Sequence, residues 1–275
     1  MSTDTFESKD GLRLFSRSWL PPGTTRGNVV VVHGLKSHSG LYEWTAEQLN
    51  QVGLAVHAAD LRGHGRSEGE RYHVDKFDDY VSDLARFVAI VRAPEPRLPL
   101  FVLGHSAGGV IACFYALDHQ KEMAGLICED FAHEVPAPDV ALAVLKGVSH
   151  VVPHAHLFNL KEEDFSRDPM FVARMKSDPL INHGPGTVQI LAEIVRADER
   201  LKKAFGRITV PVLILHGTAD KVAKPSGSKR FYEQTGSTDK TLKLYDGYFH
   251  DPLNDVGKEK VMADIIAWLG AHVPG

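Results

Sequence analysis

Cysteine is scarce in this chain. Its 275 residues include only Cys113 and Cys128, which do not form a C-x-x-C pair. A disulfide framework and a cysteine-based zinc site both need more cysteines, so the sequence excludes both. Because each cysteine lies in an apolar stretch, we predict two buried free thiols.

The chain also lacks a strong charge of either sign. Its 31 Lys and Arg residues and 35 Asp and Glu residues give a formal net charge of −4 at pH 7. A mildly acidic protein has no electrostatic field that attracts nucleic acid or anionic lipid. Binding driven by charge to either partner is therefore excluded.

Long hydrophobic runs are absent as well. No run approaches the roughly 18 apolar residues that span a bilayer, and the polar N-terminal residues 1–11 lack the apolar core of a secretory signal. We therefore expect a cytoplasmic protein. Hydrophobic residues still make up 43% of the chain and charged residues 24%, which is typical of a globular protein with a large core.

Strand-like runs alternate with amphipathic helical segments along most of the chain. This order is typical of a mostly parallel sheet that is covered by helices on both faces. We predict strands at residues 11–19, 28–32, 54–59, 100–103, 124–128, 210–215 and 242–245. We predict helices at residues 41–51, 77–91, 108–119, 226–234 and 258–269.

One segment, residues 133–187, interrupts this alternation. It has no clear buried strand, and its first helical pattern of apolar residues stops at Pro153. One interpretation is an ordinary pair of core helices. We favour an apolar cap over a pocket, because α/β folds carry their lids between sheet strands. The predicted domains are then a core of residues 1–132 and 188–275 and a cap of residues 133–187.

Two stretches match the pattern G-x-S-x-G. The first, residues 65–69, has no strand before it and no helix after it, so it is interpreted as a turn. The second, residues 104–108, follows a buried strand and precedes an apolar helix, which is the context of a nucleophile elbow. The helix N-terminus favours negative charge beside Ser106. We therefore predict Ser106 as a catalytic nucleophile.

Six motifs occur in a fixed order along the chain. They are His33-Gly34 with His38 to Tyr42, Asp60 to Ser67, Leu103 to Gly109, Ser177 to Leu180, His216 to Asp220, and Tyr245 to His250. In this order the sequence resembles the α/β-hydrolase superfamily, and within it the monoacylglycerol lipase and lysophospholipase branch. The resemblance covers nearly the whole chain. It implies an α/β-hydrolase fold with a mostly parallel eight-stranded sheet, flanking helices and an inserted helical cap.

A serine nucleophile needs a neighbouring base. In this fold the triad follows the order serine, acid, histidine. Of the 15 histidines, His250 lies between the last predicted strand and the last predicted helix, and Asp220 follows a late strand at the acid position that the resemblance implies. Asp246, Asp251 and Asp255 are rivals, but a close sequence neighbour cannot easily turn to hold the imidazole of His250. We therefore predict His250 as the base and Asp220 as the acid of the triad.

Two backbone N–H groups should form an oxyanion hole. One belongs to Ala107, directly after the nucleophile, and the resemblance points to Leu35 for the other. We interpret His33 as a residue that orders this loop through hydrogen bonds. The resulting acyl-transfer mechanism requires no metal and no organic cofactor.

The predicted cap suggests where a substrate lies. We expect an acyl chain beneath four apolar residues of the cap, Val140, Val144, Leu145 and Val148. The same apolar surface predicts transient contact with membranes or lipid aggregates through hydrophobic area. The expected partner is a small-molecule ester or lipid, with no nucleic acid, and the sequence does not predict an oligomeric state.

The chain departs from the lipase pattern at two places. Lipases of that branch tend to carry an acidic residue and an arginine, which help hold glycerol, where this chain has Ser37 and Leu41. Glu129 and Asp130 follow a strand where the branch commonly has Ser-x-Pro. If these carboxylates lie at the pocket rim, they repel a fatty-acid product or favour a polar or cationic alcohol. The alternative is pairing with structural arginines.

Three functions follow from these patterns. The first is a serine ester hydrolase that acts on monoacylglycerols, lysophospholipids or similar lipids. The second is a carboxylesterase or lactonase for small non-lipid esters. The third is a ligand-binding α/β-hydrolase with little turnover, which a complete triad disfavours.

Overall fold

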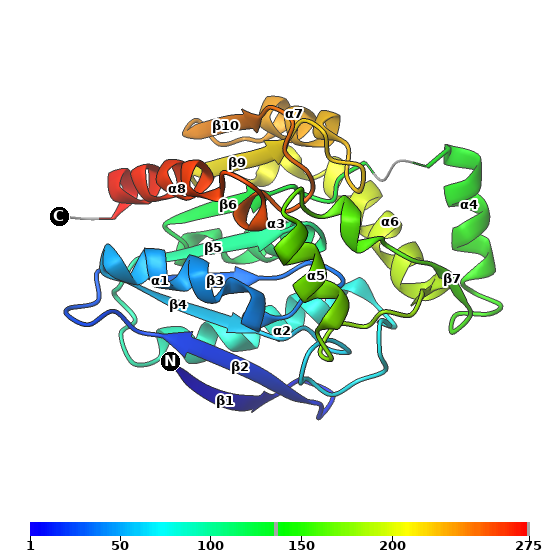
Figure 1. The fold of residues 1–275 in the computed structure, drawn as a ribbon, viewed down its shortest axis with the longest axis horizontal. Coiled ribbons are helices and arrows are strands. Elements are labelled where there is room, and N and C mark those ends of the chain that lie inside the picture. The colour runs from blue at the N-terminus through cyan, green and yellow to red at the C-terminus, as the bar shows by residue number, and fades with distance from the viewer. Residues whose placement is uncertain (135–136, 274–275) are drawn as a thin grey trace.

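An eight-stranded sheet forms the centre of the computed structural model, which describes residues 1–134 and 137–273 (Figure 1). Residues 135–136 of the predicted cap and 274–275 of the predicted core lie outside the described residues. The strand order is β1-β2-β4-β3-β5-β6-β9-β10. The strands are β1 (Ser2–Glu7), β2 (Arg13–Trp19), β3 (Gly27–Val32), β4 (Leu54–Ala59), β5 (Leu100–His105), β6 (Gly125–Glu129), β9 (Val212–Gly217) and β10 (Lys240–Tyr245).

The sheet is parallel from β4 to β10 and antiparallel at its other end, where β2 pairs with both β1 and β4. The mostly parallel eight-stranded sheet is therefore confirmed, and each of the seven strands predicted from the sequence is present. The eighth, β1, is missing from the prediction. Its six residues are polar except for Phe6 and almost all exposed, so it pairs at an edge without the alternating pattern that marks a half-buried strand.

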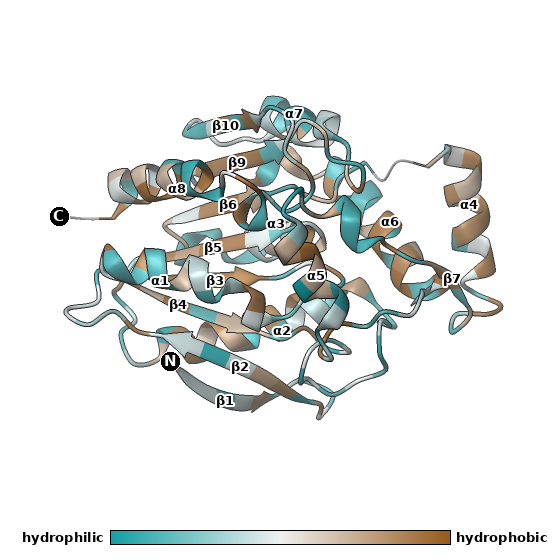
Figure 2. Cartoon of the chain, viewed as in Figure 1, coloured by the Kyte–Doolittle hydropathy of each residue, from teal (hydrophilic) through white to brown (hydrophobic). Residues whose placement is uncertain are grey.

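Helices cover both faces of the sheet, because the inner strands are apolar on both sides. Along β3, Val29 and Val31 pack in one hydrophobic cluster while Val30 and Val32 pack in the other. Figure 2 shows hydrophobic residues concentrated along the inner strands. The helices are α1 (Glu43–Gln51), α2 (Phe77–Arg92), α3 (Ala107–His119), α4 (Asp139–Val148), α5 (Pro169–Ser177), α6 (Val188–Lys202), α7 (Pro225–Gln234) and α8 (Lys258–His272).

The two clusters divide these helices between the faces. Helices α1, α5 and α8 contribute to one cluster, and α2, α3, α6 and α7 contribute to the other. Cys113 and Cys128 are buried and free, as predicted. Short 3-10 helices lie at η1 (Ser39–Tyr42), η2 (Gln120–Glu122), η3 (Glu162–Asp164), η4 (Phe205–Arg207) and η5 (Pro252–Asn254).

Residues 133–187 lie between β6 and α6. Helix α4 stands at the outer side of the molecule, where it packs on α6 (Figure 1). It ends at Val148, before the predicted stop at Pro153. The segment continues through α5 and a small antiparallel pair, β7 (His156–Phe158) and β8 (Gly186–Thr187).

The helices predicted from the sequence do not include α5 and α6. Both begin with a side chain that caps the helix. Asp168 accepts a hydrogen bond from the Met170 N–H, and Thr187 accepts one from the Ile190 N–H. Such capping residues are the sequence signal from which both helices could have been found. Within the described residues, no helix is long and apolar enough to cross a membrane.

The packing of α3 against β3 depends on a glycine. A Cβ atom at Gly108 would collide with the backbone carbonyl oxygens of Val32 and His33. We expect Gly108→Ala to lower the free energy of unfolding by about 1–3 kcal/mol or more, because overpacking forces backbone atoms apart. Urea unfolding of the purified variant measures this loss.

Gly147 provides the matched control. It lies in α4, and a Cβ there meets nothing within 4 Å. Because alanine is favoured over glycine inside a helix by about 0.5–1 kcal/mol, Gly147→Ala should leave stability equal or higher. Equal losses in the two variants would contradict the close approach of α3 to β3.

Candidate active site

Ser106 occupies the sharp turn between β5 and α3. Its backbone has φ 54° and ψ −122°, a conformation that is strained for a residue with a side chain. The N–H of Ser106 donates to the carbonyl oxygen of Glu129 at 2.9 Å, which ties the turn to the end of β6. Only 6% of the residue is exposed. The turn therefore presents the hydroxyl from a fixed position above the sheet edge.

The three residues predicted as a triad lie in hydrogen-bond contact. The Ser106 hydroxyl oxygen lies 2.7 Å from His250 Nε2, and His250 Nδ1 lies 2.7 Å from Asp220 Oδ2. The residues come from the loops after β5, β9 and β10, which end at the same edge of the sheet. Because Nδ1–H donates to the carboxylate, Nε2 is left to accept the serine proton.

The rival aspartates bond to other groups. The pairs are Asp246 with Thr218, Asp251 with Asn254, and Asp255 with Arg167. Of the four candidates, Asp220 is the one that the fold places against His250.

Asp220 is held by more groups than the sequence indicates. Its Oδ1 accepts hydrogen bonds from the N–H groups of Val222 and Ala223, and His216 Nε2 lies 3.2 Å from its Oδ2. Burial opposes ionisation, but His250 and His216 outweigh burial and hold the pKa of Asp220 well below its usual range. The carboxylate therefore stays ionised at neutral pH.

The loop after β3 lies directly against the nucleophile. A Cβ atom at Gly34 would be 2.8 Å from the Ser106 Cβ, so only glycine allows this approach. His33 Nε2 accepts from the Leu61 N–H at 2.9 Å, so its Nδ1–H donates to the Gly34 carbonyl at 2.7 Å. Burial lowers the pKa of His33 to about 3, which keeps the ring neutral in this role.

The backbone amides predicted for the oxyanion hole belong to the two segments that meet at Ser106. Ala107 is the first residue of α3, and Leu35 follows Gly34 in the adjoining loop. Among residues 1–134 and 137–273, neither N–H donates to a protein acceptor. Both amides are thus available to a substrate oxygen.

Lys36 is a residue that the motif analysis missed. Its side chain is fully buried, and its ammonium lies 2.7 Å from a carboxylate oxygen of Glu162 and 3.0 Å from Asn159 Oδ1. Lysine is almost never buried without such partners. Its backbone adopts φ 57° beside Leu35. The contact therefore fixes the loop after β3, which carries Leu35, to residues 159–162 of the predicted cap.

Glu129 and Asp130 lie in the interior and not at a pocket rim, and neither pairs with an arginine among the described residues, so both sequence interpretations are wrong. Both are fully buried. Glu129 Oε1 accepts from the Leu253 N–H at 2.8 Å, and Asp130 Oδ1 accepts from the Gly217 N–H at 3.0 Å. Only the tertiary structure places the ends of β6, β9 and β10 close enough for these bonds.

The carboxyl groups of Glu129 and Asp251 form a buried acidic pair beside His105. Burial raises the pKa of Glu129 well above its usual range, and the negative charge of the nearby Asp251 carboxylate adds to this effect. Burial raises the pKa of Asp251 to about 6. Two close, buried carboxyl groups cannot both ionise easily, so the pair retains a proton to higher pH than exposed carboxyl groups do.

The other predicted specificity residues have different environments. Ser37 and Leu41 are both buried, and Leu41 packs in the core cluster with α1 and α8. All four predicted pocket residues belong to α4. Val140 and Val144 are 76% and 60% exposed, while Leu145 and Val148 are partly buried. Part of the apolar face of α4 is therefore exposed to solvent instead of being buried over a pocket.

Two groups of metal-ligating side chains surround the triad. They are His105 with Glu129 and Asp251, and Asp130 with His216 and Asp220. Their members already hold the active-site loops, as in the bond from His105 Nε2–H to the His250 carbonyl at 2.9 Å. Each group also keeps polar atoms without a hydrogen-bond partner among the described residues: His105 Nδ1 and Glu129 Oε2 in the first and Asp130 Oδ2 in the second.

The family model described as serine aminopeptidase, S33, matches residues 23–257. A monoacylglycerol lipase of Mycolicibacterium smegmatis is 32% identical, over 99% of this chain and 98% of the relative. A monoglyceride lipase of Rattus norvegicus is 35% identical, over 96% of this chain and 89% of the relative. The crystal structure of Paleococcus ferrophilus monoacylglycerol lipase has a TM-score of 0.85 and 31% identity, covering 94% of this chain and 99% of that one.

The buried acidic pair makes stability depend on pH. Because the pKa values of Glu129 and Asp251 are raised in the folded protein, the folded state holds more protons than the unfolded chain above about pH 4. This contribution to stability is complete below the unfolded pKa values and is lost as pH rises through the folded values. Raising the pKa of Asp251 from 3.8 to about 6 corresponds to about 3 kcal/mol.

We expect Glu129→Gln to weaken this pH dependence. The amide oxygen can still accept the Leu253 N–H, but the side chain no longer ionises beside Asp251. Between about pH 5 and about pH 8 the variant should lose about 1–3 kcal/mol less stability than the parent protein. Denaturant unfolding at both pH values measures the difference. Glu47→Gln, at an exposed position of α1, is the control. If the stability of all three proteins depended on pH in the same way, the coupling between Glu129 and Asp251 would be refuted.

Proposed function

Because the chain belongs to the serine aminopeptidase S33 family of α/β-hydrolases and is a carboxylic ester hydrolase, we propose that it cleaves monoacylglycerols through Ser106, His250 and Asp220. The observation that carries this proposal is the continuous hydrogen-bonded chain of these three side chains. Relatives that are named monoacylglycerol lipases over nearly the whole chain support the substrate class.

The proposed reaction proceeds in two halves. Ser106 Oγ attacks the ester carbonyl carbon while its proton moves to His250 Nε2. The Leu35 and Ala107 N–H groups hold the resulting oxyanion, each stabilising the transition state by about 3 kcal/mol. The bond to glycerol then breaks, and His250 gives its proton to the departing alkoxide.

The second half repeats this chemistry with water. Water adds to the acyl-enzyme as His250 accepts one of its protons, and collapse of the oxyanion releases the fatty acid. The Ser106 oxygen regains its proton from His250. Asp220 keeps the imidazole in the required tautomer and stabilises the imidazolium, and its lowered pKa supports this role.

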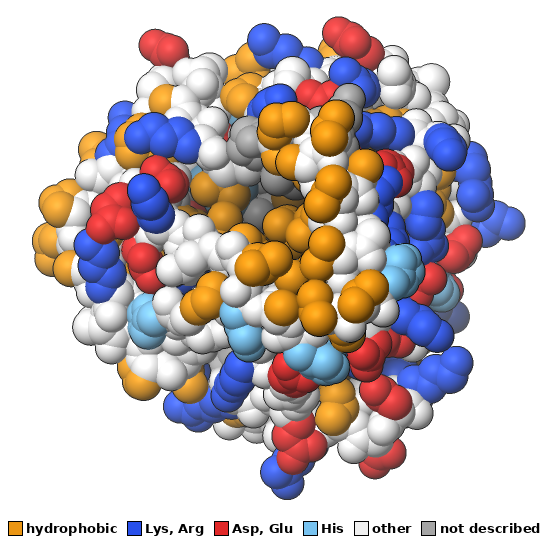
Figure 3. All heavy atoms as spheres, turned by 90° about the vertical axis from the view of Figure 1, so that its right-hand side faces the viewer, with side chains coloured by type: hydrophobic (Ala, Val, Ile, Leu, Met, Phe, Trp, Pro, Cys, Tyr) orange, Lys and Arg blue, Asp and Glu red, His pale blue; other side chains and the backbone are white. Residues whose placement is uncertain are grey.

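The open face of α4 supports a lipid substrate. Val140, Val144, Val151, Val152 and Leu157 are all exposed along α4 and the residues that follow it. Figure 3 shows hydrophobic side chains gathered on this side of the molecule next to a hollow in the surface. We propose that residues 133–187 act as a cap whose apolar residues, including Leu145 and Val148, receive the acyl chain.

The same face supplies a means of meeting lipid aggregates. With a net charge of −4, attraction to anionic membranes by charge is weak, whereas burial of apolar area contributes about 25 cal/mol per Å². We therefore propose transient contact through the exposed side chains of α4.

The first test replaces the nucleophile. We expect Ser106→Ala to lower kcat for monoolein hydrolysis by up to about 10⁶, because no other group can form the acyl-enzyme. A fluorophosphonate probe should label the parent protein and not this variant. The control is Ser67→Ala in the other G-x-S-x-G stretch, where the hydroxyl donates to the Asp60 carbonyl at 2.6 Å. Unlabelled, folded parent protein would instead support a ligand-binding role.

The second test concerns the acyl chain. Across p-nitrophenyl esters, kcat/KM should rise from acetyl to chains of about eight to twelve carbons, since each buried CH₂ contributes about 0.8 kcal/mol. Val144→Ser should lower kcat/KM about fivefold for long chains and leave acetyl unchanged. Val256→Ser, which alters an exposed valine outside residues 133–187, is the matched control. A preference for acetyl would exclude the lipase function and leave small-ester hydrolysis.

A further inference from the structure

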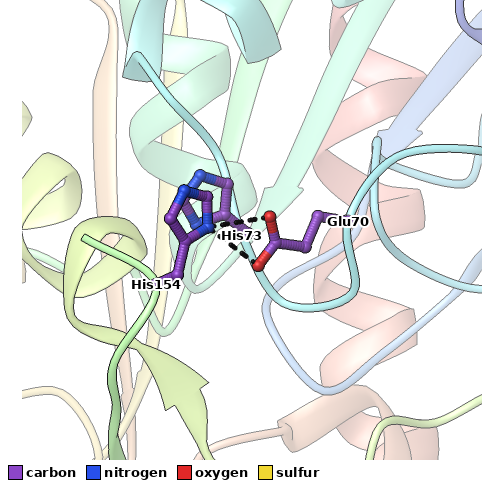
Figure 4. A group of neighbouring side chains, drawn as sticks. All are labelled: Glu70, His73 and His154. Carbon is purple, nitrogen blue, oxygen red and sulfur yellow. Dashed lines mark hydrogen bonds and ion pairs between the residues drawn. The ribbon is translucent and has the colours of Figure 1, made fainter. Parts of the chain in front are cut away.

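A second group of potential ligands lies apart from the triad. Glu70, His73 and His154 meet where the segment after α4 reaches the loop between β4 and α2 (Figure 4). One ligating atom from each residue lies within 4.8 Å of those from the other two. His154 is far from the others in sequence, so this group exists only in the folded chain.

The environment of His73 leaves a nitrogen lone pair without a donor. Its Nδ1 lies 3.0 Å from Thr187 Oγ1, and that hydroxyl in turn donates to the Tyr72 carbonyl. Nδ1 must therefore carry the proton and donate it to Thr187. The Nε2 lone pair then faces Asp75 Oδ1, another acceptor, at 3.4 Å. A positive charge between these atoms, carried either by a proton on Nε2 or by a bound metal ion, resolves the conflict. An Nδ1–H bonded to a fixed oxygen is the usual support for a ligating histidine.

Glu70 and His154 form the solvent-exposed part of this group, opposite the buried His73. The two carboxylate oxygens of Glu70 lie 3.0 and 2.9 Å from His154 Nδ1. The His154 side chain is 62% exposed, and its ring stacks on His73 with centroids 4.5 Å apart. This exposure leaves room for the ring to turn out of the stack and direct a nitrogen toward the space between Glu70 and His73.

We propose that Glu70, His73 and His154, with Asp75 beside them, bind a divalent transition-metal ion such as Zn²⁺. The two imidazoles and the Glu70 carboxylate supply three ligands of the types that zinc binds. Asp75 lies 3.4 Å from His73 Nε2, and its exposed side chain can rotate to supply the fourth. The buried His73 is held in place, while the exposed side chains adjust around it. The bound ion joins the segment that leaves α4 to the core loop and so restrains the proposed cap.

Titration of the full-length protein with ZnCl₂ by calorimetry tests the site. We expect one saturable equivalent at neutral pH, with affinity at least about tenfold weaker in His154→Ala and in Glu70→Gln. Both residues are largely exposed, so these variants should fold. Addition of Co²⁺ to the parent protein should give the intense visible absorption of four-coordinate cobalt, and either ligand variant should lose it.

A second histidine–glutamate pair supplies the control. His119 Nδ1 lies 3.4 Å from Glu122 on the surface, and Tyr115 stacks on its ring in place of a second histidine. His119→Ala should leave Zn²⁺ affinity unchanged. Absence of saturable binding, or equal affinity in the parent protein and His154→Ala, would overturn the proposal. The triad variant Ser106→Ala should bind Zn²⁺ normally, so this outcome is independent of the proposed hydrolase function.

Discussion

The parallel register of β5, β6, β9 and β10 is the constraint on which the site depends. Glu129, at the end of β6, pairs with His105 of β5 on one side and with Leu215 of β9 on the other. β10 continues this register, with Tyr245 opposite Gly217. Because parallel strands finish at a common edge, the loops that carry Ser106, Asp220 and His250 leave the sheet side by side.

The buried side chains of Glu129 and Asp130 hold the loops at this edge of the sheet, although burial of a carboxylate costs free energy. Glu129 receives an N–H from the loop after His250, and Asp130 receives one from the end of β9. Neither carboxyl has an arginine or lysine partner among the described residues that bond to it, and burial penalises its charge. Such groups favour one arrangement of the loops over others more than they add to stability. The fixed geometry is what an electrostatically preorganised site requires.

Polar contacts attach residues 133–187 to the loops of the core. Lys36, in the loop after β3, bonds Glu162, and His38 Nε2 lies 3.0 Å from Asp178 after α5. Helix α4 packs mainly on α6, where Arg196 donates to the Lys146 carbonyl. The end of the segment near the active site is thus fixed, whereas α4 presents exposed apolar side chains. This division is consistent with the proposed cap, which would have to stay aligned with the site and still admit the proposed lipid substrate.

The sequence by itself determined the sheet type and seven of its strands, because buried parallel strands require continuous apolar runs. It also selected Ser106, Asp220 and His250, since each follows a strand at a position that triad order restricts. The tertiary structure decided what depends on distant partners. It buried Glu129 and Asp130, and it paired the buried Lys36 with the carboxylate of Glu162. It also brought Glu70 and His73 next to His154. Charged residues have the same identity at a rim or in a core, so only the fold determines whether their neighbours are water, backbone amides or each other.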